Sequence, residues 1–243
     1  MEFNIRLFIR FFSNFLEGYG VTIQYAVVGI ILSLIAGLVI GLTLCLRPAV
    51  ATPILRGYIT FFRETPLLVQ MYLLYYGLPY IGVMISAPVA GLLGIVLNEG
   101  AFIAEIIRGG IEALPAGQRK AALSLGFTEL HSLLRIELPQ AFRAIIPSLT
   151  NQVSYILQDT ALFTLITIPE LTTVARALNS KYLIPGTAYI GAAIFYYPFT
   201  GCLHRQSRWF PYPIIWLALY CHASHIIYTK WCVSYILFSD VNS

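Results

Sequence analysis

Residues 18–46 read GYGVTIQYAVVGIILSLIAGLVIGLTLCL, and this stretch contains no Asp, Glu, Lys or Arg. A helix crosses the hydrocarbon core of a bilayer with about 20 apolar residues, because it satisfies its backbone hydrogen bonds within the segment. Residues 49–51 (Ala-Val-Ala) resemble a secretory cleavage site, but the run is longer than the apolar core of a signal peptide. The stretch therefore predicts a retained membrane span. Its Gly29, Gly37 and Gly41 favour close packing against another helix.

The composition of the whole chain also indicates a membrane protein. Of the 243 residues, 58% are apolar and 11% are charged, whereas about a quarter of the residues of soluble domains are charged. The net charge of +4 comes from short clusters of cations between apolar runs, which is typical of membrane orientation and unlike a nucleic-acid-binding stripe. Four cysteines show no CxxC or His/Cys spacing, so we predict no metal site.

Hydropathy predicts four further spans after the first one. They cover residues 54–78, 83–107, 144–168 and 182–203. The expected fold class is therefore an all-α membrane protein with about five transmembrane helices.

The cations predict how these helices are oriented, because cytoplasmic loops carry an excess of Lys and Arg. The loops after the first and third spans are basic: Arg47, Arg56, Arg63, Arg108, Arg119, Lys120, Arg135 and Arg143. Alternation then places the N-terminus outside. Residues 1–17 alternate charged with apolar residues and are expected to form an interfacial amphipathic helix.

One predicted cytoplasmic loop, residues 109–143, is too long and too regular for a simple connector. Its central part reads IEALPAGQRKAALSLG from Ile111 to Gly126 and continues to IELP at 136–139. Alanine favours helix, Gly126 can adopt the left-handed conformation that ends a helix, and Pro139 can start the next one. The loop therefore predicts a helix-turn-helix, with Leu123, Ile136 and Leu138 as exposed apolar side chains that dock into a soluble partner.

This loop resembles the coupling loop of the permease subunits of ABC-type importers, in which Glu-Ala-Ala, three residues, Gly, nine residues and Ile-x-Leu-Pro follow one another. The chain departs at one position, where Lys120 stands in place of the usual Glu. The residues expected to couple this chain to an ATPase are Gly117, Lys120, Ala121, Ala122, Gly126, Ile136, Leu138 and Pro139.

Other stretches are similar to the permeases for histidine, glutamine and arginine, a group of polar amino acid importers. They are FRETPLLVQ at 62–70, YYGLP at 75–79, AEIIRGGI at 104–111, LPQAFR at 138–143, NQ at 151–152, DTAL at 159–162 and IPEL at 168–171. The resemblance covers residues 18–195. It implies three kinds of partner: ABC ATPase subunits, a second permease copy or paralogue, and a periplasmic or surface amino-acid-binding protein. It also implies a multi-pass location in the bacterial inner membrane.

The chain is expected to leave ATP hydrolysis to a partner. No GxxxxGK[ST] phosphate-binding loop occurs in the sequence. We therefore predict that this chain is not an enzyme, that it binds no cofactor, and that ATP and magnesium bind to the partner ATPase.

Ionisable groups inside a membrane are costly unless they are paired or hydrated, so they are functional candidates. Glu99 and Asp159 fall within the third and fourth spans and could hold the ammonium group of an amino acid. Hydrogen-bonding groups in the same spans or nearby complete the predicted substrate pathway: Gln70, Asn98, Gln152 and Thr160. Alternatively, the two acids pair with neighbouring residues or with a partner subunit. The family usually has a small residue where Glu99 stands, so this acid is a candidate for selecting a cationic substrate. Glu105 is expected to pair with Arg108.

Residues 204–243 differ from the rest of the chain, because all three Trp and three of the four Cys lie after residue 200. We interpret this region as an atypical tail that is either divergent or read in an altered frame. The charge-free segment 209–229 is a poor candidate for a sixth span. A secondary amino acid transporter or channel without an ATPase is the alternative to an ABC permease, but it gives no reason for the coupling-loop pattern.

Overall fold

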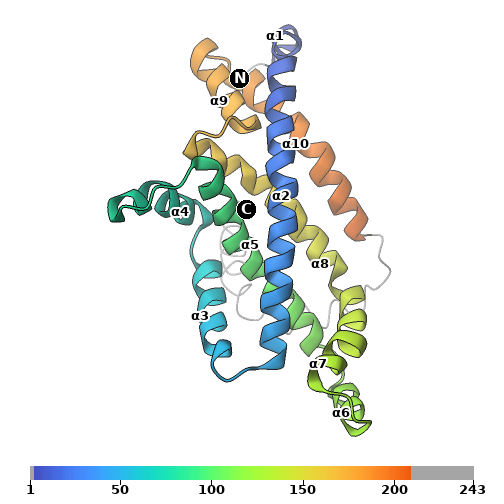
Figure 1. Ribbon diagram of the computed structural model, residues 1–243. Coiled ribbons are helices and arrows are strands. Elements are labelled where there is room, and N and C mark those ends of the chain that lie inside the picture. The colour runs from blue at the N-terminus through green and yellow to red at the C-terminus, as the bar shows by residue number, and fades with distance from the viewer. Residues whose placement is uncertain (1–2, 209–243) are drawn as a thin grey trace, which may run out of the picture. The chain divides into compact units, whose positions relative to one another are not determined.

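A computed structural model describes residues 3–208 of the chain, and the side chains of residues 3–201. This part is built from helices, and its two longest apolar helices are α2 (Phe12–Leu46) and α5 (Ala87–Glu112). Figure 1 shows α2 running through the middle of the bundle beside α5. The predicted all-α membrane fold is confirmed.

The close packing of α2 on α5 follows from the small residues of α2. Gly37 and Gly41 are buried, and a Cβ atom on Gly41 would lie 2.8 Å from the carbonyl oxygen of Ala104 on α5. A backbone atom cannot move aside as a flexible side chain can. Gly37 and Gly41, the glycines for which the sequence predicted close packing, therefore form the surface of α2 that contacts α5.

Replacing Gly41 by valine is expected to destabilise the bundle by about 1–3 kcal/mol, because overpacking forces two helices apart. The measurement is the thermal unfolding midpoint of the purified protein in detergent. Gly20→Val on the same helix is the matched control, since a Cβ at Gly20 meets nothing within 4 Å. Equal midpoints for the two variants would show that the α2–α5 contact does not depend on this glycine.

The second span, expected over residues 54–78, is not one continuous helix. Instead, α3 (Ala51–Glu64) ends at Thr65, and α4 (Leu67–Tyr72) starts after Pro66. A π-helical turn (Leu73–Gly77) and a 3₁₀ turn (Leu78–Ile81) follow. Proline has no backbone N–H and disfavours helix in the residue before it, which explains the break.

The C-terminal half contains α8 (Leu138–Asp159), a 3₁₀ segment (Thr160–Ile166), α9 (Leu171–Tyr182) and α10 (Pro185–Arg208). The helical segment 129–166 and α9 meet at an angle of 46°. By length and composition, the described residues contain two helices able to cross a membrane, or three if this bent pair is one span. The expectation of about five spans and an outside N-terminus therefore stays a prediction.

The N-terminal segment packs on the end of the bundle. Helix α1 (Ile5–Arg10) is short, and α2 begins at Phe12, inside the segment predicted to be interfacial. Phe11 and Phe15 are buried among residues of α9 and α10. The atypical tail and its possible sixth span lie outside the described residues from residue 209 onward.

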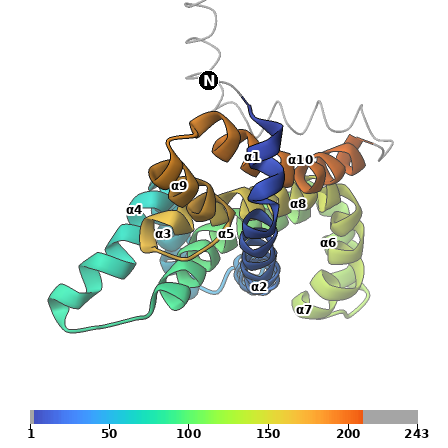
Figure 2. The same ribbon diagram turned by 90° about the horizontal axis from the view of Figure 1, so that it is seen from above.

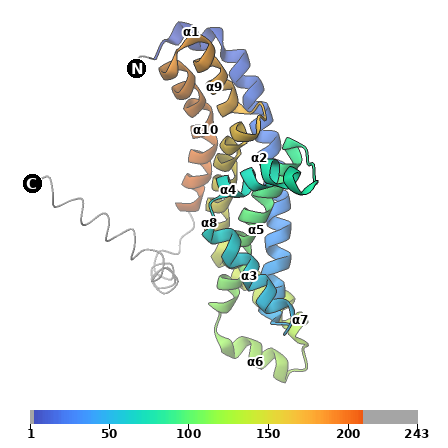
Figure 3. The same ribbon diagram turned by 90° about the vertical axis from the view of Figure 1, so that its left-hand side faces the viewer.

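The loop after α5 forms α6 (Ala116–Ser124), α7 (Glu129–Ser132) and a π-helical turn (Leu133–Glu137) that leads into α8. Figure 2 shows α6 and α7 on one side of α2, with α3 and α4 on the other. Figure 3 shows α6 at the end of the bundle opposite to α1. The N-terminus and this loop therefore lie at opposite ends.

Candidate functional site

The break between α3 and α4 is held by two amide side chains. Because Pro66 cannot donate to the Phe62 carbonyl one turn before it, that oxygen needs another donor. Gln70 Nε2 donates to it at 3.0 Å and Asn98 Nδ2 donates at 2.7 Å. Gln70 Nε2 also donates to the Thr65 carbonyl at 3.0 Å. Irregular backbone inside a membrane protein is tolerated where buried side chains satisfy it in this way.

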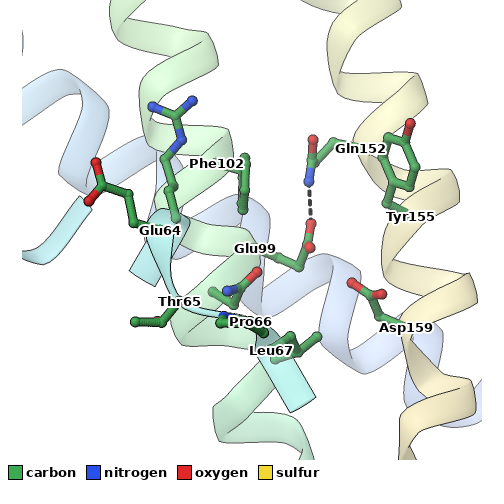
Figure 4. A pocket seen from close by; sticks show the side chains of 11 residues that line it. Glu64, Thr65, Pro66, Leu67, Glu99, Phe102, Gln152, Tyr155 and Asp159 are labelled. Atoms are coloured by element: carbon green, nitrogen blue, oxygen red, sulfur yellow. Dashed lines mark hydrogen bonds between the residues drawn. The ribbon is translucent and has the colours of Figure 1, made fainter. Parts of the chain in front are cut away.

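This break, α5 and α8 line an open cavity of about 500 Å³ (Figure 4). Its size is within the usual range for small-molecule sites. Polar and charged groups from all three sides face it. The residues that line the cavity are Arg63, Glu64, Thr65, Pro66, Leu67, Asn98, Glu99, Phe102, Gln152, Tyr155 and Asp159.

Two carboxyl groups lie close together on one side of the cavity. Glu99 on α5 is only 3% exposed, and Gln152 Nε2 on α8 donates a hydrogen bond to it. Figure 4 shows the Asp159 carboxyl directed towards the same space. Neither carboxyl forms an ion pair with a Lys or Arg of the described chain. The cavity therefore contains the buried Glu99 and the half-buried Asp159, and neither is ion-paired with Arg63, the basic side chain that also lines it.

The predicted pathway residues divide into two groups. Asn98, Glu99, Gln152 and Asp159 come together at the cavity. Gln70 and Thr160 do not line it: Gln70 braces the break, and the buried Thr160 hydroxyl donates to the Leu157 carbonyl at 2.7 Å. Asn98 lines the cavity and braces the break as well.

Sequence reasoning missed the other residues that line the cavity: Arg63, Glu64, Thr65, Pro66, Leu67, Phe102 and Tyr155. Arg63 lies over the ring of Phe102, with its guanidinium carbon 5.1 Å from the ring centroid. The signal that could have found them is Pro66 inside an apolar run, since a broken helix at membrane depth marks a cavity. The predicted ion pair between Glu105 and Arg108 is confirmed.

Replacing Gln70 by leucine is expected to lower the free energy of unfolding by about 1–3 kcal/mol, because the half-buried Thr65 carbonyl loses the amide donor that Gln70 provides. Thermal unfolding in detergent measures this loss. Gln140→Leu is the control, since the exposed Gln140 makes a single hydrogen bond, to the Ile136 carbonyl. An unchanged midpoint in Gln70→Leu would contradict the bracing role and favour a role in binding.

The helix-turn-helix predicted in the long loop is present. Gly126 has a φ of +85°, its N–H donates to the Leu123 carbonyl, and the Phe127 N–H donates to the Ala122 carbonyl. These two bonds form the Schellman motif that ends a helix at a left-handed glycine. Pro139 was expected to start the second helix, but that helix begins at Glu129 and runs through the π-helical turn into α8, so Pro139 lies within a continuous helical segment.

The exposed side chains of the loop differ in part from those expected. Leu123 is exposed, but Ile136 and Leu138 are only partly exposed, and Leu138 packs against the core. The turn and the first part of the second helix face outward, whereas the residues that lead into α8 pack towards the bundle. The exposed apolar side chains are Leu123, Leu125, Phe127, Leu130 and Leu134. Lys120, Ala121 and Gly117 are exposed beside them, whereas Ala122 is buried.

Charged groups gather where the loop meets the bundle. Arg47 at the end of α2 pairs with Glu112 at the end of α5, with an N–O distance of 3.4 Å. Arg119 on α6 pairs with Glu137, and this contact raises the pKa of the Arg119 guanidinium above its usual range. The two loops predicted to share one side of the membrane therefore meet at one end of the bundle.

Comparison with protein families identifies a match over residues 29–211 to the family described as "Binding-protein-dependent transport system inner membrane component". The match continues beyond residue 195, where the resemblance was expected to end. It covers most of the chain.

Curated relatives agree with this family. The chain is 37% identical over 199 residues to the probable amino-acid ABC transporter permease protein YckA of Bacillus subtilis (strain 168), covering 80% of this chain and 86% of the relative. It is 31% identical to the probable glutamine ABC transporter permease protein GlnM of the same organism, covering 79% and 89%. It is 30% identical to the nopaline transport system permease protein NocM of Agrobacterium fabrum (strain C58 / ATCC 33970), covering 83% and 88%.

Two solved structures share the fold. One, described as an amino acid ABC transporter with histidines, has a TM-score of 0.78 and 30% identity, covering 86% of this chain and 98% of that one. The inward-facing MetNI methionine ABC transporter has a TM-score of 0.68 and 15% identity, covering 84% and 99%, and therefore supports the fold alone.

Proposed function

This chain belongs to the binding-protein-dependent transport system inner membrane components, the permease subunits of ABC importers, and on that premise we propose that it imports a polar amino acid across a bacterial inner membrane. The chain itself is a transport subunit, and a separate subunit hydrolyses ATP. The proposal adds the cargo, the membrane and the roles of individual residues.

The observation that carries the proposal is the loop built on the Gly126 turn. It presents exposed Leu123, Leu125 and Phe127 beside Lys120 at one end of the bundle. An apolar patch rimmed by charge is the composition of a docking surface for a soluble partner. ATP-driven closure of paired ATPase subunits pulls on residues 112–139 and rocks the bundle between outward and inward openings.

The partners that this mechanism needs are three. ABC ATPase subunits bind ATP and magnesium beneath the coupling loop. A second permease copy or paralogue completes the path. A periplasmic or surface binding protein delivers the amino acid. The chain is multi-pass, with its N-terminus outside and the coupling loop in the cytoplasm, which is the orientation that the basic loops predict.

The cavity supports a cationic or zwitterionic cargo. Glu99 and Asp159 are acids without a basic partner in the described chain, so they suit an ammonium or guanidinium group. Arg63 at the break and Tyr155 on α8 can donate to a carboxylate. The names of relatives support an amino acid as the cargo, and the paired acids favour a basic one.

The test is reconstitution of the chain with its ATPase and binding protein in liposomes. We expect the loaded binding protein to stimulate ATP hydrolysis and labelled arginine or lysine to accumulate against a gradient. Glutamine and glutamate are the matched cargo controls. Uptake that proceeds without any ATPase would contradict the proposal and favour a secondary carrier.

A further inference from the structure

Arg119 connects three separate elements at the end of the bundle. Its Nε donates to both carboxylate oxygens of Glu137, at 3.0 and 3.1 Å. Its Nη1 donates to the Cys45 carbonyl at 3.4 Å. Arg119 lies on α6, Glu137 ends the π-helical turn before α8, and Cys45 lies in the last turn of α2. One guanidinium group thus joins the exposed loop to two helices of the bundle.

The pair is shielded from water on its acidic side. The Glu137 side chain is 6% exposed, and Ser132 Oγ donates to it at 2.9 Å. The Arg47–Glu112 pair at the same end has side chains that are 66% and 38% exposed. An exposed pair contributes little, whereas a buried acid that loses its partner leaves an uncompensated charge. Arg119 and Glu137 are therefore held together much more firmly than their neighbours.

The position of Glu137 connects this pair to the cavity. The Leu133–Glu137 turn continues directly into α8, which carries Gln152, Tyr155 and Asp159 into the cavity wall. A π-helical turn is a local irregularity of a helix, and such turns are frequent at functional sites. A movement of Glu137 therefore reaches α8 at its first turn.

The same guanidinium holds the end of α2, which packs along α5, the helix that carries Glu99. The main neighbours of α6 in the described chain are α7 and the π-helical turn. Few other contacts can carry a force from α6 to the spans.

We propose that the Arg119–Glu137 pair, together with the Cys45 carbonyl, is the linkage through which movement of the coupling helix α6 reaches α2 and α8. This inference rests on the proposed function. Arg119 is a positioning residue: it lies outside the cavity and acts through the two helices that it holds. The chain connection at Ala113–Pro115 also joins α6 to α5, and the exposed Arg47–Glu112 pair joins α2 to α5 without involving α6.

The test compares four variants of the complete reconstituted transporter: Arg119→Met, Arg119→Lys, the double variant Arg119→Met/Glu137→Met, and Arg47→Met as the matched control. The double variant replaces both charges by apolar side chains, which removes the uncompensated acid and preserves folding. Three quantities are measured for each: co-purification of the ATPase, ATP hydrolysis, and amino acid transported per ATP hydrolysed.

We expect the double variant to retain the ATPase and to hydrolyse ATP, while transport per ATP falls about 10-fold, as for loss of a typical coupling between two sites. Arg119→Met is expected to lose transport per ATP to at least the same extent. Arg119→Lys keeps the positive charge but lacks the planar guanidinium group that donates to Glu137 and to the Cys45 carbonyl at once. It is therefore expected to show transport per ATP between that of Arg119→Met and that of the wild type. Arg47→Met is expected to behave as the wild type.

Wild-type transport per ATP in the double variant would overturn the inference, because the pair would then only stabilise the fold. Loss of ATPase binding in all Arg119 variants would overturn it in favour of a role in assembly. If the wild-type transporter shows no ATP-dependent uptake, the proposed function fails and the inference falls with it. These outcomes separate the two failures.

Discussion

Replacing Gly126 by valine is expected to abolish co-purification of the ATPase with the permease and to reduce transport to background. Gly126 has a φ of +85°, and a β-branched residue is strongly disfavoured in that conformation. The N–H groups of Gly126 and Phe127 would no longer reach the carbonyls of Leu123 and Ala122. The turn would open, and the apolar side chains around it would lose their arrangement.

Two controls show whether the backbone conformation is the cause. Gly126→Asn is expected to keep most of the ATPase binding, because asparagine tolerates the left-handed region. Gly57→Val places the same bulk on α3, where a Cβ meets nothing within 4 Å, and is expected to bind the ATPase normally. Normal transport by Gly126→Val would refute the assignment of residues 112–139 as the coupling loop.

Neutralising both cavity acids, Glu99→Gln with Asp159→Asn, is expected to reduce uptake of a cationic amino acid by about 10-fold to 100-fold. A hydrogen bond to a charged group contributes about 1.5–3 kcal/mol. The double variant removes the negative charges that α5 and α8 contribute to the cavity and leaves Glu64 in place. The amide side chains keep the shape of the cavity. Uptake of labelled arginine or lysine by liposomes containing the complete transporter measures the effect.

The ATPase should still co-purify with this double variant, because Glu99 and Asp159 lie in the cavity, away from the loop. Glu17→Gln, at an exposed acid of α2, is the matched control and should leave uptake unchanged. If the double variant transports the cation as well as the wild type does, the acids have only a structural role. If this variant loses uptake of neutral amino acids to the same extent as uptake of the cation, the two acids do not select the cargo by its charge.

Local patterns were sufficient to predict the Gly126 turn and the glycine step of α2. A left-handed glycine after Ala-Ala-Leu-Ser-Leu is determined by the nearby backbone, so a pattern of a few residues carries the information. Glycines four apart on an apolar run indicate a packing face in the same way. The permease family also follows from local spacing, since the coupling-loop motif occupies about twenty consecutive residues and needs no knowledge of the fold.

Side-chain pairing between distant elements could not be read in this way. The role of Asn98 depends on the Phe62 carbonyl, 36 residues earlier in the chain. Gln70 was predicted to lie in the pathway because it is polar in an apolar segment, yet Pro66 leaves carbonyls nearby that require its amide group. Polarity at membrane depth identifies a residue that needs a partner, but the partner can be either a ligand or the backbone.

The sequence by itself determined that the chain is a helical membrane protein of the ABC permease family, because hydropathy and short motifs are properties of neighbouring residues. Only the tertiary structure decided which polar groups share the cavity and which hold the chain together. Asp159 meets Glu99 at that cavity, and Arg119 reaches both Glu137 and the end of α2. Such contacts depend on how helices far apart in the sequence pack, and that packing fixes the distances on which hydrogen bonds and ion pairs depend.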